Sequence, residues 1–348
     1  MRNALRSGTY ELCQGEAAHG VVNAMVSIIS KHKRYGHLKG LVNAVLRKVA
    51  DKGPEQWPSL RTPRLPSWLR KPLVQAWGAE AVMGMETAFY APTPLDLTPK
   101  TDAAAVAQAT GGTVLPTGSV RLADAGQVST LPGFTSGDWW VQDAAAAIPA
   151  GNLNVQPGET VLDLCAAPGG KTMQLAASGA TVTAVDISAS RMERVKQNII
   201  RTGLDAATKI ADVFDITGKY DAVLLDAPCS ATGTIRRHPD LPFAKDGSEF
   251  GALIELQGRM LDHAVTLLKP GGRLLFCTCS LLPDEGEVQI EEAIDRHPDL
   301  AVETDALNRP GIEADWITEE GGLRLRPDLW AEHGHMDGFY IAALRKSP

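Results

Sequence analysis

Hydrophobic residues along the chain follow two different patterns. Between residues 9 and 50 they recur at helical spacing, which predicts two or three amphipathic helices. From Trp139 onward, short runs of consecutive apolar residues alternate with helical stretches. The expected strands cover 160–165, 181–187, 208–213, 220–227, 273–278 and 338–344, and the expected helices cover 171–177, 190–202 and 250–268. This alternation predicts an α/β fold with a doubly wound, mostly parallel sheet that helices cover on both faces.

The segment between these regions, residues 57–137, is rich in Pro, Thr and Gly. It holds short strand candidates such as Leu95–Leu97 and an Ala-rich helix candidate near 102–110, which together predict a small α+β module of an RRM-like kind. We therefore expect three domains: a helical region over 1–56, the accessory module over 57–137 and a Rossmann-like domain over 138–348.

Composition is that of an ordinary globular protein, with 44% hydrophobic and 22% charged residues among 348. No apolar run approaches the roughly 18 residues of a membrane span, and the first residues lead into no signal-peptide core. We therefore expect a cytoplasmic protein with no membrane partner. The five cysteines are an odd number at irregular spacing, which argues against a disulfide framework. Cys277 and Cys279 alone make a poor zinc site, so no metal is expected.

Charge is distributed unevenly along the chain. Residues 1–71 hold 13 Lys and Arg against four acidic residues, a net charge of +9, whereas the whole chain carries a net charge of -7. A basic first part on an acidic body suggests a polyanionic partner bound by the first part. The alternative, that these charges only solvate helix faces, fits the sequence equally well.

One loop has the features of a cofactor-binding loop. The apolar run Val161–Leu164 leads into Cys165, Ala166, Ala167, Pro168, Gly169, Gly170 and Lys171. The two glycines let the backbone pass close to a ligand, and the turn opens a helix whose first amides face that ligand. A phosphate-binding P-loop would need Gly at the position of Cys165, and no GxGxxG pattern is present. The loop therefore predicts a ligand without a pyrophosphate group.

Acidic residues stand at the expected ends of three strands. Asp186 stands where a carboxylate accepts hydrogen bonds from ribose hydroxyls, and Asp212 is positioned to accept one from an adenine amino group. Asp226 ends the next strand. A single aspartate at such a position is more often a helix cap, but three in one sheet favour binding. A nucleoside without phosphates at this edge indicates S-adenosylmethionine as the cofactor.

Two cysteines follow the fourth and fifth expected strands, Cys229 and Cys279. Carbon 5 of a pyrimidine is too weakly nucleophilic to take a methyl group unaided, and a thiolate that adds to carbon 6 converts the ring into an enamine that is reactive at carbon 5. Asp226 is a candidate to bind the N3 or amino edge of a cytosine. The residues alone do not decide which of the two thiols attacks. For Cys13, Cys165 and Cys277 we favour a role as small apolar residues.

The sequence resembles the RNA cytosine-5 methyltransferases of the Sun/Fmu type. The resemblance rests on Val161–Thr172, Asp226–Gly233, Arg236–Asp240, Thr278–Ser280, Leu131–Phe134, Val141–Asp143, Lys39–Arg47 and Asp337–Tyr340, and thus on nearly the whole chain. It implies a class I methyltransferase fold, S-adenosylmethionine as cofactor, and a cytosine in RNA, most directly in 16S rRNA, as the target. We also expect a monomer. It implies that Cys279 is the nucleophile, that Cys229 assists product release, and that Cys165–Lys171, Asp186, Asp212 and Asp226 line the cofactor pocket.

In that family a NusB-like helical domain precedes the catalytic part, and we expect this chain to hold only the last helices of such a domain. Two alternatives stay open at this point. The same chemistry acting on tRNA or 23S rRNA fits the sequence, because target choice depends on the accessory modules. A non-catalytic RNA-binding assembly factor with the same fold is a second alternative, against which the two cysteines and the intact cofactor loop argue.

Overall fold

The computed structural model describes residues 1–60 and 62–348, which form two compact units, Met1–Pro63 and Arg64–Pro348. The first unit consists of α1 (Arg2–Cys13), α2 (Ala18–Ser30) and α3 (Lys39–Gln56), with short 3-10 turns at Gly36–Leu38 and Trp57–Ser59. Its apolar side chains pack against one another, with Leu12, Val22, Ile29, Val42 and Leu46 buried between the helices. The helical spacing of the sequence therefore reflects a small three-helix core within this unit.

The second unit begins with α4 (Ser67–Ala88), a long helix that the sequence pattern did not predict. Pro72 lies within it, and Gly78 interrupts it with a non-helical backbone of φ 82°. These two residues disguise the helix because both normally end helices. The buried side chains Leu69 and Leu73 of α4 share a core with Leu281 and Leu282, which follow the last strand of the parallel sheet.

A small antiparallel sheet with the strand order β2-β3-β1-β4 follows α4. Its strands are β1 (Leu95–Pro99), β2 (Thr113–Val114), β3 (Val120–Leu122) and β4 (Trp139–Val141), and α5 (Ala103–Thr110) packs against it. β4 pairs with β1 although it follows residue 137, where the accessory module was expected to end. The chain then passes through α6 (Ala144–Asn152) into the large sheet.

The large sheet has the strand order β10-β12-β9-β8-β5-β6-β7, with β11 paired to β12. Its strands are β5 (Thr160–Leu164), β6 (Thr181–Asp186), β7 (Ala207–Ile210), β8 (Tyr220–Asp226), β9 (Leu268–Thr278), β10 (Leu300–Val302), β11 (Leu323–Leu325) and β12 (Phe339–Lys346). Strands β5 to β9 are mutually parallel, and β12 enters antiparallel to β9. The expected doubly wound, mostly parallel sheet is confirmed.

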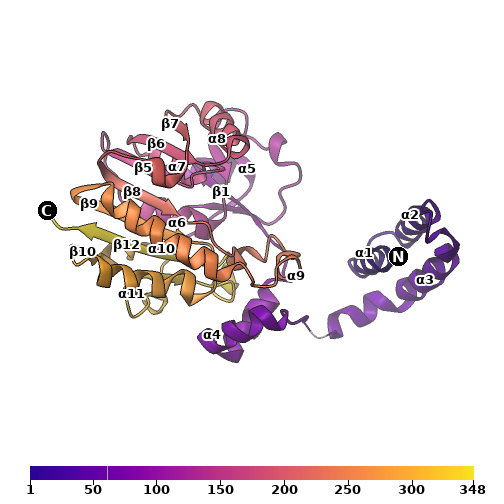
Figure 1. The fold of residues 1–348 in the computed structure, drawn as a ribbon. Coiled ribbons are helices and arrows are strands. Elements are labelled where there is room, and N and C mark those ends of the chain that lie inside the picture. Colours follow the sequence, from indigo (N-terminus) through magenta and orange to yellow (C-terminus); the bar gives the residue numbers. More distant parts are fainter. Residues whose placement is uncertain (61) are drawn as a thin grey trace. The chain divides into compact units, whose positions relative to one another are not determined.

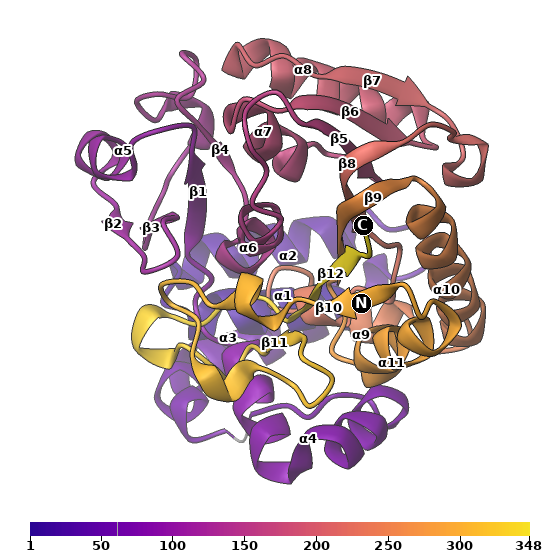
Figure 2. The ribbon, with the colours of Figure 1, turned by 90° about the vertical axis from the view of Figure 1, so that its left-hand side faces the viewer.

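Helices cover both faces of this sheet (Figures 1 and 2). On one face α6, α7 (Gly170–Ala177) and α8 (Ala189–Thr202) pack on apolar residues such as Val161 and Ala184. On the other face α10 (Phe250–Thr266) and α11 (Glu287–Arg296) pack on Leu162 and Val223. Neighbouring residues of one strand thus enter opposite cores, which explains the continuous apolar runs. Over residues 1–60 and 62–348, no helix combines the length and the apolar character that crossing a membrane requires.

Several element boundaries differ from the sequence-based expectation. β9 begins at Leu268 instead of residue 273, because Lys269–Gly272, which resembles a turn, is part of the strand. β7 ends at Ile210, so Asp212 stands beyond the strand and caps the 3-10 turn Val213–Asp215 instead. β10 and β11 were not expected, because strands of three residues carry no readable period. The helix α11 (Glu287–Arg296) was also not expected.

Gly233 joins three distant segments beside the carboxyl ends of the strands. Its amide donates to the Cys279 carbonyl at 2.9 Å, and its carbonyl accepts from the Gly338 amide at 2.9 Å. A Cβ at this position would lie 2.0 Å from the Gly338 carbonyl oxygen. Only glycine therefore fits between the loop after β8, the loop after β9 and the start of β12.

Gly233→Ala should destabilise the protein by about 1 to 3 kcal/mol, because the added methyl group forces these backbones apart. Gly251→Ala is the matched control, since nothing lies within 4 Å of a Cβ at this position in α10. In a helix, alanine should raise stability by about 0.5 to 1 kcal/mol over glycine. Urea unfolding of both variants measures the difference, and equal unfolding midpoints would contradict the close packing at Gly233.

Candidate active site

A cavity of about 500 Å³ lies at the carboxyl ends of the parallel strands. The strand order reverses here, between β5 and its neighbours β6 and β8, which is where open α/β sheets bind ligands. The cavity brings together seven predicted site residues, Cys165, Ala167, Asp186, Asp212, Asp226, Cys229 and Cys279. Apolar side chains form much of the remaining wall, namely Ile187, Val213, Phe214, Leu256 and Met260. The cavity thus combines acidic groups, thiols and an apolar surface.

The predicted cofactor loop turns sharply at the end of β5. Cys165 and Gly169 both have positive φ, 60° and 101°, and α7 begins directly after Gly169. The Ala166 amide donates to the Val185 carbonyl at 2.9 Å, and the Ala167 amide donates to Asp186 Oδ2 at 3.2 Å. Hydrogen bonds to the end of β6 therefore hold the loop against the edge of the cavity.

Asp186 is a buried hydrogen-bond centre at the end of β6. Besides the Ala167 amide, its carboxylate accepts from the Ser188 amide at 2.8 Å and from the Arg191 guanidinium at 2.8 and 2.9 Å. Arg191 itself is more than half exposed. A ligand hydroxyl that binds Asp186 would therefore either bind beside the Arg191 guanidinium or displace it from the carboxylate.

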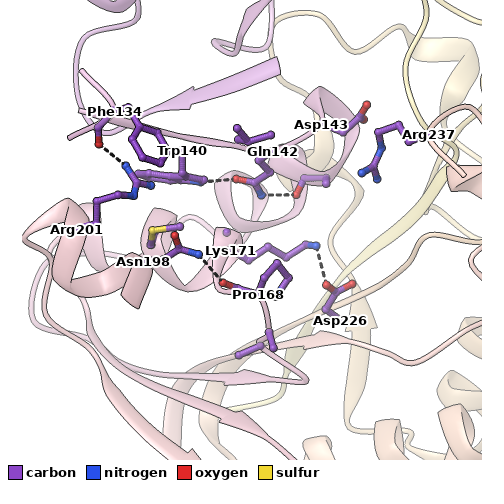
Figure 3. Close-up of a pocket in the computed structure, with 16 residues that line it drawn as sticks. Phe134, Trp140, Gln142, Asp143, Pro168, Lys171, Asn198, Arg201, Asp226 and Arg237 are labelled. Carbon is purple, nitrogen blue, oxygen red and sulfur yellow. Dashed lines mark hydrogen bonds and ion pairs between the residues drawn. The ribbon is translucent and has the colours of Figure 1, made fainter. Parts of the chain in front are cut away.

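Asp226 pairs with Lys171, the last residue of the predicted loop. Lys171 Nζ donates to Asp226 Oδ2 at 2.8 Å, and Figure 3 shows the lysine side chain reaching toward this carboxylate. Burial by itself would lower the pKa of Lys171, but the Asp226 carboxylate outweighs it and the pKa is raised overall. Lys171 therefore remains charged and holds Asp226 in place.

The two candidate thiols are in contact. Cys229 Sγ and Cys279 Sγ lie 3.5 Å apart, and both side chains are partly buried. The hydrogen bond with Cys279, together with burial, raises the pKa of the Cys229 thiol well above its ordinary value. Cys229 therefore keeps its proton at neutral pH, and its sulfur lies within hydrogen-bond distance of the Cys279 sulfur.

The other cysteines of this unit have less reactive surroundings. Burial raises the pKa of the Cys165 thiol to about 12, with nearby aspartates adding to the effect. Burial also raises the pKa of Cys277 well above its ordinary value, and its sulfur lies 3.4 Å from Asp226 Oδ1. A protonated thiol is a poor nucleophile, so both residues suit the apolar role expected of them.

A second cavity of about 320 Å³ adjoins the first and shares Ala167 and Asp226 with it. Ala166, Pro168, Gly170 and Lys171 of the loop line this second cavity (Figure 3). Its other walls include Phe134 and Trp140, with Arg201 stacked over the Phe134 ring at 4.6 Å. Arg237, which pairs with the buried Asp337, also lines it. The predicted loop therefore separates an acidic cavity from one that contains aromatic and basic groups.

Sequence reasoning missed three features of this region. The Lys171–Asp226 pair joins residues 55 positions apart, which no local pattern reveals. Phe214, Leu256 and Met260 supply the apolar wall, and the helical period of residues 250–268 gave no sign that this helix reaches the cavity. Arg191 lies five residues after Asp186, and a cation so close to a predicted ribose-binding carboxylate was the available signal.

Two family models match the chain. The model described as "16S rRNA methyltransferase RsmB/F" matches residues 150–345, and the NusB family model matches residues 1–51. Relatives described as "Ribosomal RNA small subunit methyltransferase B" include that of Pseudomonas putida, 38% identical over 94% of this chain and 78% of the relative. The one from Xanthomonas campestris is 42% identical over 88% of this chain and 72% of the relative.

Solved structures agree with the fold. A methyltransferase homolog protein from Pyrococcus horikoshii is 27% identical, with a TM-score of 0.64 over 81% of this chain and 95% of that one. A structure described as NSun6 from Pyrococcus horikoshii with SFG has a TM-score of 0.68 over 81% of this chain and 98% of that one. Its identity is 19%, so this likeness concerns the fold alone.

The sheet and its edge cavity define a Rossmann-like class I methyltransferase. The chain belongs to the 16S rRNA methyltransferase RsmB/F family, because that model covers more than half of it and relatives align along most of its length. This membership confirms the resemblance drawn from the sequence and the expectation of S-adenosylmethionine as the cofactor. It also supports RNA as the partner.

Asp163 lies on β5, two residues before the predicted cofactor loop, and its carboxyl group is fully buried. Its Oδ2 accepts from Thr172 Oγ1 at 2.5 Å, whereas its Oδ1 is buried without a hydrogen-bond partner. Burial raises the pKa of Asp163 to about 7, and the Thr172 hydroxyl offsets this effect only in part. The carboxyl group therefore binds its proton more tightly in the folded state than in the unfolded chain.

Protonated Asp163 should stabilise the fold at low pH, and this contribution should be lost as the pH rises from about 4 through about 7. Asp163→Asn removes the titration, so wild-type stability should fall relative to the variant by up to about 4 kcal/mol across this range. Urea unfolding of both proteins at pH 5, 6, 7 and 8 measures the difference. If the free energies of unfolding of the two proteins change in parallel with pH, the raised pKa of Asp163 is contradicted.

Proposed function

We propose that this protein transfers a methyl group from S-adenosylmethionine to carbon 5 of a cytosine in 16S rRNA, through a covalent bond between Cys279 and the cytosine. One observation carries the proposal: two thiols lie 3.5 Å apart on the wall of a cavity that also holds three strand-end or loop carboxylates. Thiols are needed for methylation at carbon 5, whereas methylation of an amino group or a hydroxyl needs none.

The larger cavity suits S-adenosylmethionine in size and chemistry. Its volume of about 500 Å³ is in the usual range for small-molecule sites. The apolar wall around Phe214 suits an adenine ring, and Asp186 suits the ribose hydroxyls. Asp212 already accepts from the Phe214 amide at 3.1 Å and has a second oxygen for the adenine edge. When bound, S-adenosylmethionine supplies an electrophilic methyl group and positive charge that these carboxylates favour.

Cys279 is the proposed nucleophile. A bond from its sulfur to carbon 6 of the cytosine moves the ring electrons to carbon 5, which then takes the methyl group. Loss of the carbon 5 proton to a base and cleavage of the sulfur to carbon 6 bond release the product and restore the thiol. Cys229 Sγ lies 3.5 Å from Cys279 Sγ, so it is within reach of the same nucleotide for the release step.

Asp226 is the proposed contact for the cytosine ring. It lines both cavities, so a base that enters from the second cavity meets it beside the thiols. Lys171 orients its carboxylate at 2.8 Å. Flipping a base out of the RNA stack into such a pocket is the usual route for enzymes that modify bases. The aromatic and basic walls of the second cavity suit the nucleotides around the target.

The first unit is the proposed RNA-binding accessory part. The NusB family model matches it, and its turn between α2 and α3 carries the exposed residues Lys31, Lys33 and Arg34. Its basic charge contrasts with the acidic remainder of the chain. Electrostatic attraction to phosphates would therefore act mainly through this unit.

Bisulfite sequencing of 16S rRNA from cells with and without the gene tests the proposed function. One cytosine should lose its protection from deamination in the deletion strain and regain it when the gene is restored. A protected site that changes only in tRNA or 23S rRNA would favour those substrates. An unchanged pattern in all RNAs would favour a non-catalytic assembly factor.

Asp186→Ala should weaken the binding of S-adenosylmethionine by about 1.5 to 3 kcal/mol, the usual contribution of a hydrogen bond to a charged group. Asp215→Ala is the control, because Asp215 is exposed and belongs to the nearby 3-10 turn without lining the cavity. Calorimetric titration of each variant with the cofactor gives the affinities. Equal affinities would argue against the ribose contact.

Removal of each thiol should block a different step. Cys279→Ala should abolish methylation and leave cofactor binding intact, because no bond to carbon 6 can form. Cys229→Ala should accumulate a protein-RNA adduct that survives denaturation, because release is impaired. Denaturing gels with labelled RNA show the adduct, and Cys13→Ala serves as the control. An adduct in Cys279→Ala alone would reverse the two roles.

A further inference from the structure

Glu285 is a buried carboxylate that joins the two cysteine loops from behind. It is fully buried at the end of the 3-10 turn Pro283–Glu285. Its Oε2 accepts from Ser230 Oγ at 2.5 Å and from Ser280 Oγ at 2.6 Å. Its Oε1 accepts from the Ser230 amide at 2.8 Å and from Gln257 Nε2 at 3.0 Å. Ser230 directly follows Cys229, and Ser280 directly follows Cys279.

These contacts differ from those of an ordinary buried ion pair. Among the ion pairs of the described residues none includes Glu285, whereas the nearby Glu287 pairs with Arg324. A buried carboxylate is costly to desolvate, and here neutral hydroxyl and amide donors compensate for that cost. Replacement of Glu285 by an apolar side chain would remove the acceptor of four buried donors, so the positions of these donors depend on the carboxylate. We therefore infer that Glu285 holds the loops that carry Cys229 and Cys279 in fixed positions.

The contacts restrain both thiols together. Gln257 also donates to the Pro228 carbonyl at 2.9 Å, which ties the residue before Cys229 to the same carboxylate. On the other side, Thr278 Oγ1 donates to the Glu285 carbonyl at 2.7 Å, which ties the residue before Cys279 to the same turn. Residues on both sides of each cysteine are thus bonded to Glu285 directly or through Gln257.

We propose that Glu285 is a positioning residue that sets the spacing of Cys229 and Cys279 by binding the serine that follows each of them. The catalytic meaning of this spacing rests on the proposed function, but the spacing itself does not. While Cys279 is bonded to the substrate, Cys229 has to reach the same nucleotide for release. We call these bonds from Glu285 to Ser230 and Ser280 the clamp. Loss of the clamp should therefore impair product release more than cofactor binding.

Oxidation of the thiol pair measures the spacing without RNA. Diamide takes up two electrons and two protons from two thiols and leaves a disulfide, which requires the sulfurs to close to about 2.05 Å. The wild-type pair, 3.5 Å apart, should form this bond readily. In Glu285→Gln an amide group faces serine donors, so the loops should separate and the bond should form at least about tenfold more slowly. Peptide mapping identifies the Cys229–Cys279 disulfide.

Further variants separate positioning from folding. Glu86→Gln is the matched control, because Glu86 is a buried carboxylate on α4 that accepts from Arg70 and the Leu65 amide and is not bonded to the cysteine loops. Ser280→Ala removes the hydroxyl bond from the Cys279 loop to Glu285, and Ser230→Ala removes the hydroxyl bond from the Cys229 loop but keeps the bond from the Ser230 amide. Both variants leave the carboxylate in place. They keep the test decisive if Glu285→Gln fails to fold.

We expect slower disulfide formation in Glu285→Gln and in both serine variants, with the affinity for S-adenosylmethionine unchanged by calorimetry. With 16S rRNA, the adduct should build up in these variants and turnover should fall, as for Cys229→Ala. Oxidation rates equal to those of wild type and Glu86→Gln in the folded variants would overturn the clamp. Slower oxidation without any adduct, in wild type or variants, would leave the clamp valid and refute the covalent mechanism instead.

Discussion

The parallel pairing of β8 with β9 is the constraint on which the site depends. In this register Asp226 lies opposite Cys277, and both strands end at the same edge of the sheet. Cys229 and Cys279 follow shortly after these residues, so the two thiols come from segments 50 residues apart and still meet. A slip by one residue would turn alternate side chains to the other face and separate the thiols. Glu285 and Gly233 then refine a contact that the sheet has already made.

The two cavities at this edge of the sheet differ in the charged residues that line them. The larger cavity holds Asp186, Asp212 and Asp226, whereas the second cavity holds Lys171, Arg201 and Arg237. The Lys171–Asp226 pair lies on the boundary between them. Under the proposed function, a cationic methyl donor and an anionic RNA would occupy separate cavities that share Asp226. The two ligands would then not compete for the same charges.

The parallel sheet was predictable because its strands are buried on both faces and appear as uninterrupted apolar runs. The loop after β5 and the aspartates near the strand ends were predictable as one site, because parallel strands end at one edge of the sheet. α4 was not predictable, because Pro72 and Gly78 lie inside it. Neither were the contacts of Lys171 and Glu285, which depend on distant segments. The assignment of Cys279 as the nucleophile and of Cys229 to product release came from the family resemblance alone.

The place of β12 in the sheet has a consequence for the making of the protein. This strand, Phe339–Lys346, comes last in sequence among the described strands and lies between β9 and β10 in the interior of the sheet. Gly338, at its start, also bonds to Gly233 beside the thiols. During synthesis β12 emerges after the other strands of this sheet. The β9 edge of the parallel strands therefore stays unpaired, and the loop that carries Gly233 stays without its bond to Gly338, until β12 has been made.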